Sequence, residues 1–227
     1  KKKTILVIGD IMLDKYVYGL TNRISPEAPV PVVRINNTNY ILGGASNTAN
    51  NIKSLGGQVI IASVIGNDNG AKIIRDLLKE KKIKSLLVVD KLRPTTIKER
   101  VISGNNHQLL RLDYEETNDI PINIEKELFY KFKNSINEID GVIMSDYAKG
   151  VLTPKLCKSI IKLCKQKKIP VLVDGKPDNV DSFIGCTLIT PNLKEARDMT
   201  GEKNDIMLMG KKLVNKLKSN VLLTRGG

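Results

Sequence analysis

Beyond Pro121 the apolar positions follow a regular alternation of helical and strand-like segments. The helical segments repeat apolar residues every three or four positions, whereas the strand-like segments are short apolar runs. Helices are expected at 122–136, 154–167, 193–199 and 205–218, and strands at 142–145, 170–173, 187–190 and 221–224. This alternation predicts an α/β fold whose mostly parallel sheet has helices on both faces and binds ligands at the carboxyl ends of its strands.

The residues before Pro121 contain the same kind of alternation, with two interruptions. Strands are expected at 4–8, 59–65 and 85–89, and helices at 45–55 and 71–81. The segment of about 16–35 is rich in turn residues and predicts only short flanking strands, and the segment 95–112 predicts a hairpin around Gly104. Because neither segment fits the alternation, we expect them to form a small β lid beside the main sheet.

The length of 227 residues is enough for one domain, over residues 1–227, with a well-buried core. No apolar run has the length of a membrane span, and Lys1-Lys2-Lys3 leads straight into the first expected strand with no signal peptide before it. We therefore expect a cytoplasmic protein that makes no membrane contact.

The formal net charge of +13 permits binding to nucleic acids or to phosphorylated small molecules. The lysines are scattered over expected helix surfaces, as in 165–168, and no helix-turn-helix, zinc-finger or RNA-binding aromatic pattern occurs, so we expect no nucleic-acid partner. Cys157, Cys164 and Cys186 form no Cys-x-x-Cys pair, and His107 is the only histidine, so buried thiols are favoured over a zinc site or a disulfide.

Two adjacent glycines open the first expected helix, in the stretch Gly43-Gly44-Ala45-Ser46-Asn47-Thr48-Ala49. Glycines let the backbone turn sharply and approach a ligand closely, and the start of a helix offers free N–H groups to a polar or anionic ligand. Asn47 can present both a donor and an acceptor to a sugar hydroxyl. The stretch therefore predicts a site for a small polar ligand.

Two aspartates follow the first expected strand, in Gly-Asp-Ile-Met-Leu-Asp. A carboxylate at the end of a strand can accept hydrogen bonds from sugar hydroxyls, or it can cap a turn or helix. We favour a sugar contact for Asp14 and leave both interpretations open for Asp10.

Acidic and basic residues also follow later strands. Asn192 and Glu195 are spaced as a helix cap and its capping-box partner, and the same pair could organise Mg²⁺ and phosphates. Asp174 could reach Mg²⁺ and Lys176 could neutralise a phosphate, although a polar turn before Pro177 would look the same. The stretch Ser145-Asp146-Tyr147-Ala148-Lys149-Gly150 is a further strand end with one acid and one base.

The spaced pattern of residues 43–49, with Gly56 and Gly66 behind it, resembles the first signature of the PfkB (ribokinase-like) carbohydrate kinases. No Walker A loop and no Gly-x-Gly-x-x-Gly is present. The resemblance implies a ribokinase-like fold that uses ATP and Mg²⁺. It implies that the sugar is held by Asp14, Gly43, Gly44 and Asn47, that Asn192, Glu195 and Asp174 order Mg²⁺ and phosphate, and that the nucleotide phosphates lie over the turn of Thr224, Arg225 and Gly226.

Three stretches resemble the heptose 7-phosphate kinases of this family more specifically: Arg23 to Val33, Arg93 to Lys98 and Leu109 to Asp113. The resemblance implies transfer from ATP to O1 of D-glycero-β-D-manno-heptose 7-phosphate, which gives the 1,7-bisphosphate on the way to ADP-heptose and lipopolysaccharide core, by a homodimer. Candidates for holding the 7-phosphate are Arg23, Lys98, Arg100 and Arg111, each of which could equally form a lid salt bridge.

The second signature of the family, Gly-Ala-Gly-Asp, does not occur in these residues. Its aspartate is the general base of the family and its glycine amides stabilise the developing charge. We therefore expect a C-terminally incomplete kinase domain that is inactive by itself. The alternatives are another PfkB sugar or sugar-phosphate kinase and a non-catalytic sugar- or nucleic-acid-binding protein.

Overall fold

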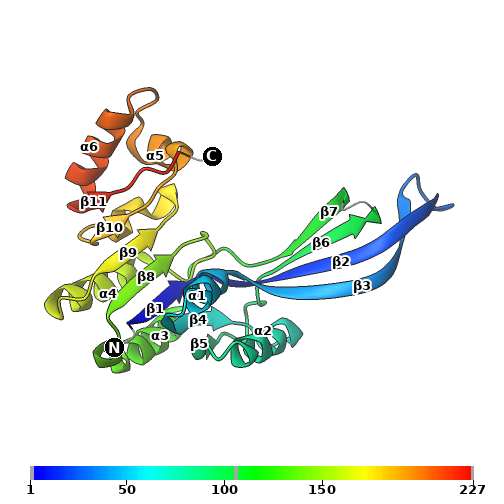
Figure 1. The fold of residues 1–227 in the computed structure, drawn as a ribbon, viewed down its shortest axis with the longest axis horizontal. Coiled ribbons are helices and arrows are strands. Elements are labelled where there is room, and N and C mark those ends of the chain that lie inside the picture. Colours follow the sequence, from blue (N-terminus) through cyan, green and yellow to red (C-terminus); the bar gives the residue numbers. More distant parts are fainter. Residues whose placement is uncertain (1–2, 105–106, 226–227) are drawn as a thin grey trace.

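The computed structural model describes residues 3–104 and 107–225 and contains two sheets (Figure 1). The larger sheet has seven parallel strands in the order β11-β10-β9-β8-β1-β4-β5. Its strands are β1 (Thr4–Gly9), β4 (Gln58–Ile65), β5 (Lys84–Val89), β8 (Gly141–Ser145), β9 (Val171–Asp174), β10 (Leu188–Ile189) and β11 (Asn220–Val221). The expected parallel sheet is thus confirmed.

Helices cover both faces of this sheet. Successive side chains of a strand point to opposite faces, and in these strands both sets are apolar. On β1, Val7 belongs to the core with α1 and α2, whereas Leu6 and Ile8 belong to the core with α3, α4, α5 and α6. The helices are α1 (Ala45–Ser54), α2 (Asn69–Glu80), α3 (Ile122–Asn134), α4 (Pro154–Gln166), α5 (Leu193–Thr200) and α6 (Ile206–Leu217), with 3-10 turns η2 (Ile136–Glu138) and η3 (Pro177–Phe183). No helix within the described ranges is both long and apolar enough to span a membrane.

The second sheet is the lid, which extends away from the main body (Figure 1). Its strands run in the order β3-β2-β6-β7. They are β2 (Ile11–Ile24), β3 (Pro31–Gly44), β6 (Ile97–Ser103) and β7 (His107–Tyr114). The hairpin expected within 95–112 is confirmed as β6 and β7.

The expectation of short strands around 16–35 is wrong, since β2 and β3 each have 14 residues. Only the segment between them turns, where the Ser25 N–H donates to the Val30 carbonyl over 2.8 Å. Most of β3 is exposed and its middle, residues 36–39, is polar, so hydrogen bonding to β2, rather than a local apolar pattern, keeps it extended.

The strand expected at 221–224 is shorter than the pattern suggested. β11 ends at Val221, and Thr224 forms only an isolated parallel bridge with Asn192. This bridge nevertheless places Thr224 beside the start of α5.

Candidate functional site

Most of the predicted site residues lie either on the lid strands or just after strands β9 and β10 of the main sheet. They form two clusters. The lid cluster contains Asp14, Lys98, Arg100, Arg111 and Asp113. The α5 cluster contains Asp174, Lys176, Asn192 and Glu195.

The two glycines before α1 make room for Asp14. A Cβ atom on Gly43 would overlap Oδ2 of Asp14 and come within 2.9 Å of Cγ of Met12. Gly44 has a φ of +56° and its Cβ position would overlap the carbonyl oxygen of Asp10, which accepts a 2.9 Å hydrogen bond from Ala45 N–H. The Asp14 carboxylate therefore lies directly against the Gly43 backbone at the start of α1.

An arginine from a neighbouring lid strand holds this carboxylate. Nη1 of Arg100 donates to Oδ1 of Asp14 over 2.6 Å, and the guanidinium lies 5.2 Å from the centre of the Tyr16 ring. Burial has the largest effect and lowers the pKa of Arg100, but the hydrogen bond to Asp14 and the nearby negative charges, that of Asp14 first, together outweigh it, so the pKa is raised. Arg100 therefore stays charged beside Asp14.

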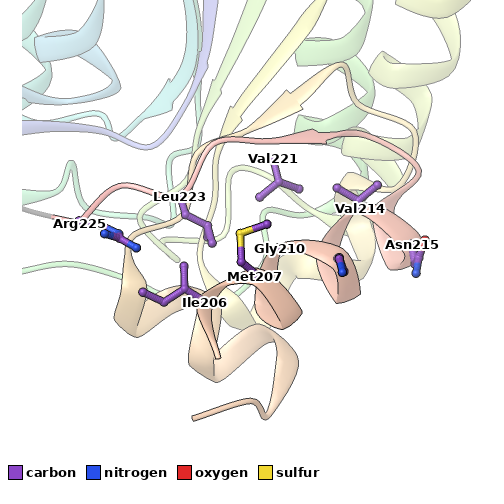
Figure 2. Close-up of a pocket in the computed structure, with 9 residues that line it drawn as sticks. Ile206, Met207, Gly210, Val214, Asn215, Val221, Leu223 and Arg225 are labelled. Atoms are coloured by element: carbon purple, nitrogen blue, oxygen red, sulfur yellow. The ribbon is translucent and has the colours of Figure 1, made fainter. Parts of the chain in front are cut away.

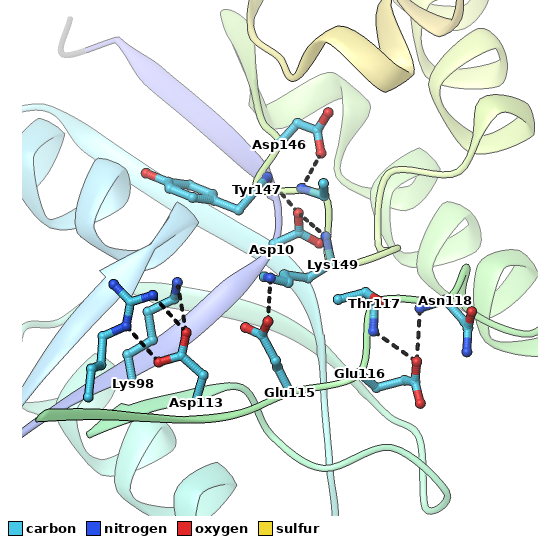
Figure 3. A network of polar contacts seen from close by, with 12 residues as sticks. Asp10, Lys98, Asp113, Glu115, Glu116, Thr117, Asn118, Asp146, Tyr147 and Lys149 are labelled. Carbon is cyan, nitrogen blue, oxygen red and sulfur yellow. Dashed lines mark hydrogen bonds and ion pairs between the residues drawn. The ribbon is translucent and has the colours of Figure 1, made fainter. Parts of the chain in front are cut away.

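Further cations lie on the same face of the lid. Strand register places Lys98 opposite Asp14 and Asp113, and Arg111 opposite Arg100. Nε of Arg111 is 2.8 Å from Oδ1 of Asp113, and Nζ of Lys98 is 3.9 Å from Oδ2 of Asp113 (Figure 3). Two arginines directly opposite each other repel, so an anion bound between them would be stabilised.

The α5 cluster is built on a capping box. Oδ1 of Asn192 accepts from Glu195 N–H over 2.9 Å, and Oε2 of Glu195 accepts from Asn192 N–H over 3.0 Å. The other oxygen of Glu195 is 2.6 Å from Nζ of Lys176. Burial has the largest effect and opposes the charge on Lys176, but the hydrogen bond to Glu195 and the charges of Glu195 and Asp174 together outweigh it, so the pKa of Lys176 is raised. Capping therefore coexists with a fixed ammonium group at the end of β9.

Asp174 lies beside this pair and carries an unfavourable charge. Burial, followed by the nearby Glu195, raises the pKa of the Asp174 carboxyl group above its usual value. Carboxylate oxygens are the ligands that Mg²⁺ prefers, and in this structure the two oxygens of Glu195 are held by Lys176 and by Asn192 N–H. Among the described residues no three His, Cys, Asp or Glu side chains converge as a metal site, and Mg²⁺ in such sites usually relies on one or two carboxylates with waters and phosphates.

The loop Asp146–Val151, which follows β8 and is called the β8 loop below, contacts Lys176 through Asp146 and the segment after β7 through Lys149; Figure 3 shows the second contact. The Asp10 carboxylate, which is only 1% exposed, accepts from the N–H groups of Tyr147 at 2.7 Å, Lys149 at 3.2 Å and Val151 at 3.1 Å. Burial raises the pKa of Asp10, although these N–H groups counter it. Of its two interpretations, the structure supports the structural one, because Asp10 is occupied with the backbone of this loop.

Five other predicted residues lie outside the two clusters, at their margins or outside the described residues. Asn47 is exposed in the first turn of α1. Arg23 lies nine residues along β2 from Asp14, which corresponds to roughly 30 Å of strand, so this chain does not bring it to the lid cluster. Thr224 N–H donates to the carbonyl of Pro191 over 3.0 Å, and Arg225 is exposed. Gly226 lies outside the described residues.

An apolar cavity of about 520 Å³ lies between α6 and β11, and Figure 2 shows its lining. Ile206, Met207, Val214, Val221 and Leu223 supply most of its surface, with Arg225 at one end. β11 is an outer strand of the main sheet, so the cavity is on the far side of the α5 cluster from the lid. Its apolar lining holds none of the carboxylates described above.

The lid cluster offers a carboxylate and cations to a polar ligand, and the α5 cluster offers a fixed ammonium group at the end of β9. An α/β protein with these two clusters has the parts of a sugar phosphotransferase. The family model of the pfkB carbohydrate kinases matches residues 2–227. The chain therefore belongs to the PfkB family of carbohydrate kinases.

Curated relatives share substantial sequence with the chain. It is 42% identical over 226 residues to "Bifunctional protein HldE" of Campylobacter curvus, covering 98% of the chain and 47% of that protein. It is 43% identical over 199 residues to the protein of the same name from Caulobacter sp., covering 87% of the chain and 40% of that protein. The chain thus spans less than half the length of these relatives.

Solved structures agree on the fold. Phosphofructokinase-2 from Escherichia coli, in its tetrameric inhibited form, matches with a TM-score of 0.76 at 17% identity, over 100% of this chain and 74% of that one. The same enzyme in complex with fructose-6-phosphate matches with a TM-score of 0.75 at 17% identity, over 100% of this chain and 75% of that one. The ribokinase-like fold expected from the sequence is thereby confirmed.

Sequence reasoning missed Arg93, whose side chain is buried at the junction of the lid and the main sheet. The sequence marks Arg93 only as the first residue of the stretch Arg93 to Lys98, which resembles the heptose 7-phosphate kinases. An arginine directly before a proline in a connecting segment carries no local pattern that distinguishes a buried side chain from a solvated one.

Proposed function

We propose that this chain is the kinase part of an enzyme that transfers phosphate from ATP to O1 of D-glycero-β-D-manno-heptose 7-phosphate. The product would be the 1,7-bisphosphate, which feeds ADP-heptose and lipopolysaccharide core synthesis. The observation that carries this proposal is the lid face, where Asp14 at the Gly43 turn lies next to the cations Lys98, Arg100 and Arg111. This face offers one carboxylate for sugar hydroxyls and several cations for a phosphate at the other end of the sugar.

In this proposal Asp14 accepts hydrogen bonds from sugar hydroxyls and Asn47 adds a further contact, while the close Gly43-Gly44 backbone admits the ring. Arg100 and Arg111 take the 7-phosphate, because a guanidinium can donate two parallel hydrogen bonds to phosphate oxygens. Lys98 adds charge on the same face.

The nucleotide is proposed to lie at the α5 cluster. Lys176, fixed by Glu195, would face the transferred phosphate, and Asn192 would keep Glu195 in place through the capping box. Asp174 and Glu195 would hold Mg²⁺, which neutralises phosphate charge when it is bound. Thr224, Arg225 and Gly226 would lie under the other nucleotide phosphates. The general base is not assigned among these residues, and we propose that the complete gene product supplies it.

The proposed assembly is a cytoplasmic homodimer without nucleic-acid or membrane partners. Leu110, Leu112 and Tyr114 lie at alternate positions of the outer lid strand β7 and are 42–50% exposed. A second copy of the chain would bury this apolar row.

The proposal is tested by measuring ADP release from the complete gene product with Mg-ATP and a panel of sugar phosphates. The panel includes the heptose 7-phosphate, fructose 6-phosphate and ribose. Turnover at least tenfold more efficient with the heptose supports the proposal. A preference for another sugar keeps the family assignment and overturns the substrate, and no turnover with any sugar overturns the proposed reaction.

A further inference from the structure

Arg93 is an almost buried arginine in the segment that enters the lid from β5. Its Nη1 donates to the carbonyl of Lys149 over 2.7 Å and to that of Glu116 over 3.1 Å, and its Nη2 donates to the carbonyl of Asn118. Asp90, at 3.9 Å from Nε, is its nearest carboxylate. One guanidinium therefore joins three stretches of backbone that are distant in sequence.

Two of these stretches are the segments that connect the β6–β7 hairpin of the lid to the main sheet. Arg93 itself precedes β6, and Glu116 and Asn118 follow β7. The third is the β8 loop, which contributes Lys149. Arg93 thus joins both connections of the hairpin to the β8 loop, in addition to the pairing of β6 with β2.

Further contacts join the β8 loop to the segment after β7 (Figure 3). Nζ of Lys149 is 2.7 Å from Oε1 of Glu115. Ile120 N–H donates to the Gly150 carbonyl over 3.0 Å, and a Cβ atom on Gly150, whose φ is +79°, would overlap the Asn118 carbonyl. The loop and this segment therefore pack backbone against backbone.

The same loop also reaches the α5 cluster. Oδ2 of Asp146 accepts from Lys176 N–H over 3.1 Å and from Nδ2 of Asn179 over 2.9 Å. The β8 loop therefore contacts the residues proposed for the phosphate at one end and the lid at the other.

We propose that Arg93 is a positioning residue that fixes the lid hairpin, through the β8 loop, relative to Lys176. This inference rests on the proposed function, because the hairpin carries Lys98 and Arg100. Arg93 touches no substrate in this scheme. Its loss would let the hairpin move away from the loop, and the sugar phosphate would lose its lid contacts while the nucleotide kept its own.

The test uses Arg93→Lys in the complete gene product. Lysine keeps the charge but has no planar fork to reach the three carbonyls. We expect the KM for the sugar phosphate to rise about tenfold or more, which corresponds to about 1.4 kcal/mol, with the KM for ATP within about twofold. Hydrogen exchange without substrate should become faster in β6 and β7 and stay unchanged in β1 and β4.

A matched control separates positioning from general destabilisation. Ile160→Val removes a methyl group from the core of α4, away from both clusters. Arg93→Lys overturns the inference if it lowers only the melting temperature, as the control does, or if it slows use of both substrates equally. If the wild-type enzyme turns over no sugar phosphate, the proposed function fails. Separately, unchanged hydrogen exchange in β6 and β7 of Arg93→Lys would overturn this inference.

Lys149→Met provides a second variant in case Arg93→Lys does not fold. It removes only the ion pair with Glu115 and leaves Arg93 in place. We expect a smaller rise in the KM for the sugar phosphate, about threefold, and faster exchange in β7. Unchanged KM and unchanged exchange in this variant would contradict the inference.

Discussion

The contact between Asp14 and the Gly43 backbone is the single-residue feature on which the proposed sugar site depends. Asp14 is fixed from two sides, by the turn before α1 and by Arg100 on the lid. Both supports can be removed one at a time, and each removal has a distinct expected effect on the use of the sugar phosphate.

Gly43→Ala should push the Asp14 carboxylate away from the start of α1, because the added methyl group would overlap it. We expect the KM for the sugar phosphate in the complete gene product to rise about tenfold or more, or about 1.4 kcal/mol, with little change in the KM for ATP. Steady-state kinetics with Gly104→Ala as control checks this, since a Cβ atom there meets nothing closer than 4.0 Å. Equal effects of the two variants would contradict the assignment of Asp14.

Arg100→Met should remove the cation that holds Asp14 and faces the proposed 7-phosphate. A hydrogen bond to a charged group contributes about 1.5–3 kcal/mol, so kcat/KM for the sugar phosphate should fall by about 10–100-fold. Lys84→Met is the control, because Lys84 forms an exposed ion pair with Glu138 on the main sheet. If Arg100→Met instead tightens sugar binding, Arg100 competes with the sugar for Asp14.

At the scale of elements, α2 shows how a helix start can also anchor the lid. Oδ1 of Asp68 caps the helix by accepting from Ala71 N–H over 2.8 Å, and Oδ2 accepts from Thr95 N–H over 2.7 Å just before β6. Burial opposes the charge, but the N–H of Thr95 and then that of Ala71 lower the pKa of Asp68. The ionised form therefore stabilises both the helix and the junction.

Asp68→Ala should destabilise the protein by about 1–2 kcal/mol at pH 7, the usual range for a lost N-cap. Because the folded-state pKa is lowered, the contribution is fully present above the ordinary pKa of an aspartate and is lost as the pH falls through the folded-state value. Urea unfolding between pH 3 and 8 measures the free energy of unfolding of both proteins, and the difference between Asp68→Ala and wild type should become smaller as the pH falls. Asp205→Ala, which removes only the cap of α6, should cost less; an equal cost would show that the Thr95 contact adds nothing.

At the scale of the whole molecule, the lid exposes an apolar row on β7 that a single chain leaves uncovered. The exposed fractions are 45% for Leu110, 42% for Leu112 and 50% for Tyr114. Such a row on an outer strand invites association, and a second copy is the partner we propose.

The double substitution Leu110→Glu and Leu112→Glu should convert the proposed dimer into a monomer, because charges cannot be buried at a copy-to-copy interface without partners. Light scattering during size-exclusion chromatography measures the mass directly. Leu92→Glu is the control, since Leu92 is 94% exposed but lies outside the lid strands. A dimer that persists in the double variant would place the interface elsewhere.

Local patterns were enough to predict the main sheet and its helices. Expected helices such as 154–167 and 193–199 agree with α4 and α5 within one residue at each end. The Asn192–Glu195 cap was also predicted, because both of its hydrogen bonds are made within one helical turn. The length of β2 and β3 was not, since their pairing is a property of two strands together.

The sequence by itself determined the alternation of helices and strands, the glycine turn before α1 and the capped start of α5. These features depend on residues within a few positions of one another, so their chemistry is visible in the order of residues. Only the tertiary structure decided that Arg100 pairs with Asp14, 86 residues away, and that Asp10 holds the β8 loop, up to 141 residues away. The first pair forms because β2 and β6 lie side by side in the lid, and the second because β1 and β8 are neighbouring parallel strands that end at the same edge of the main sheet. No local pattern specifies either pairing.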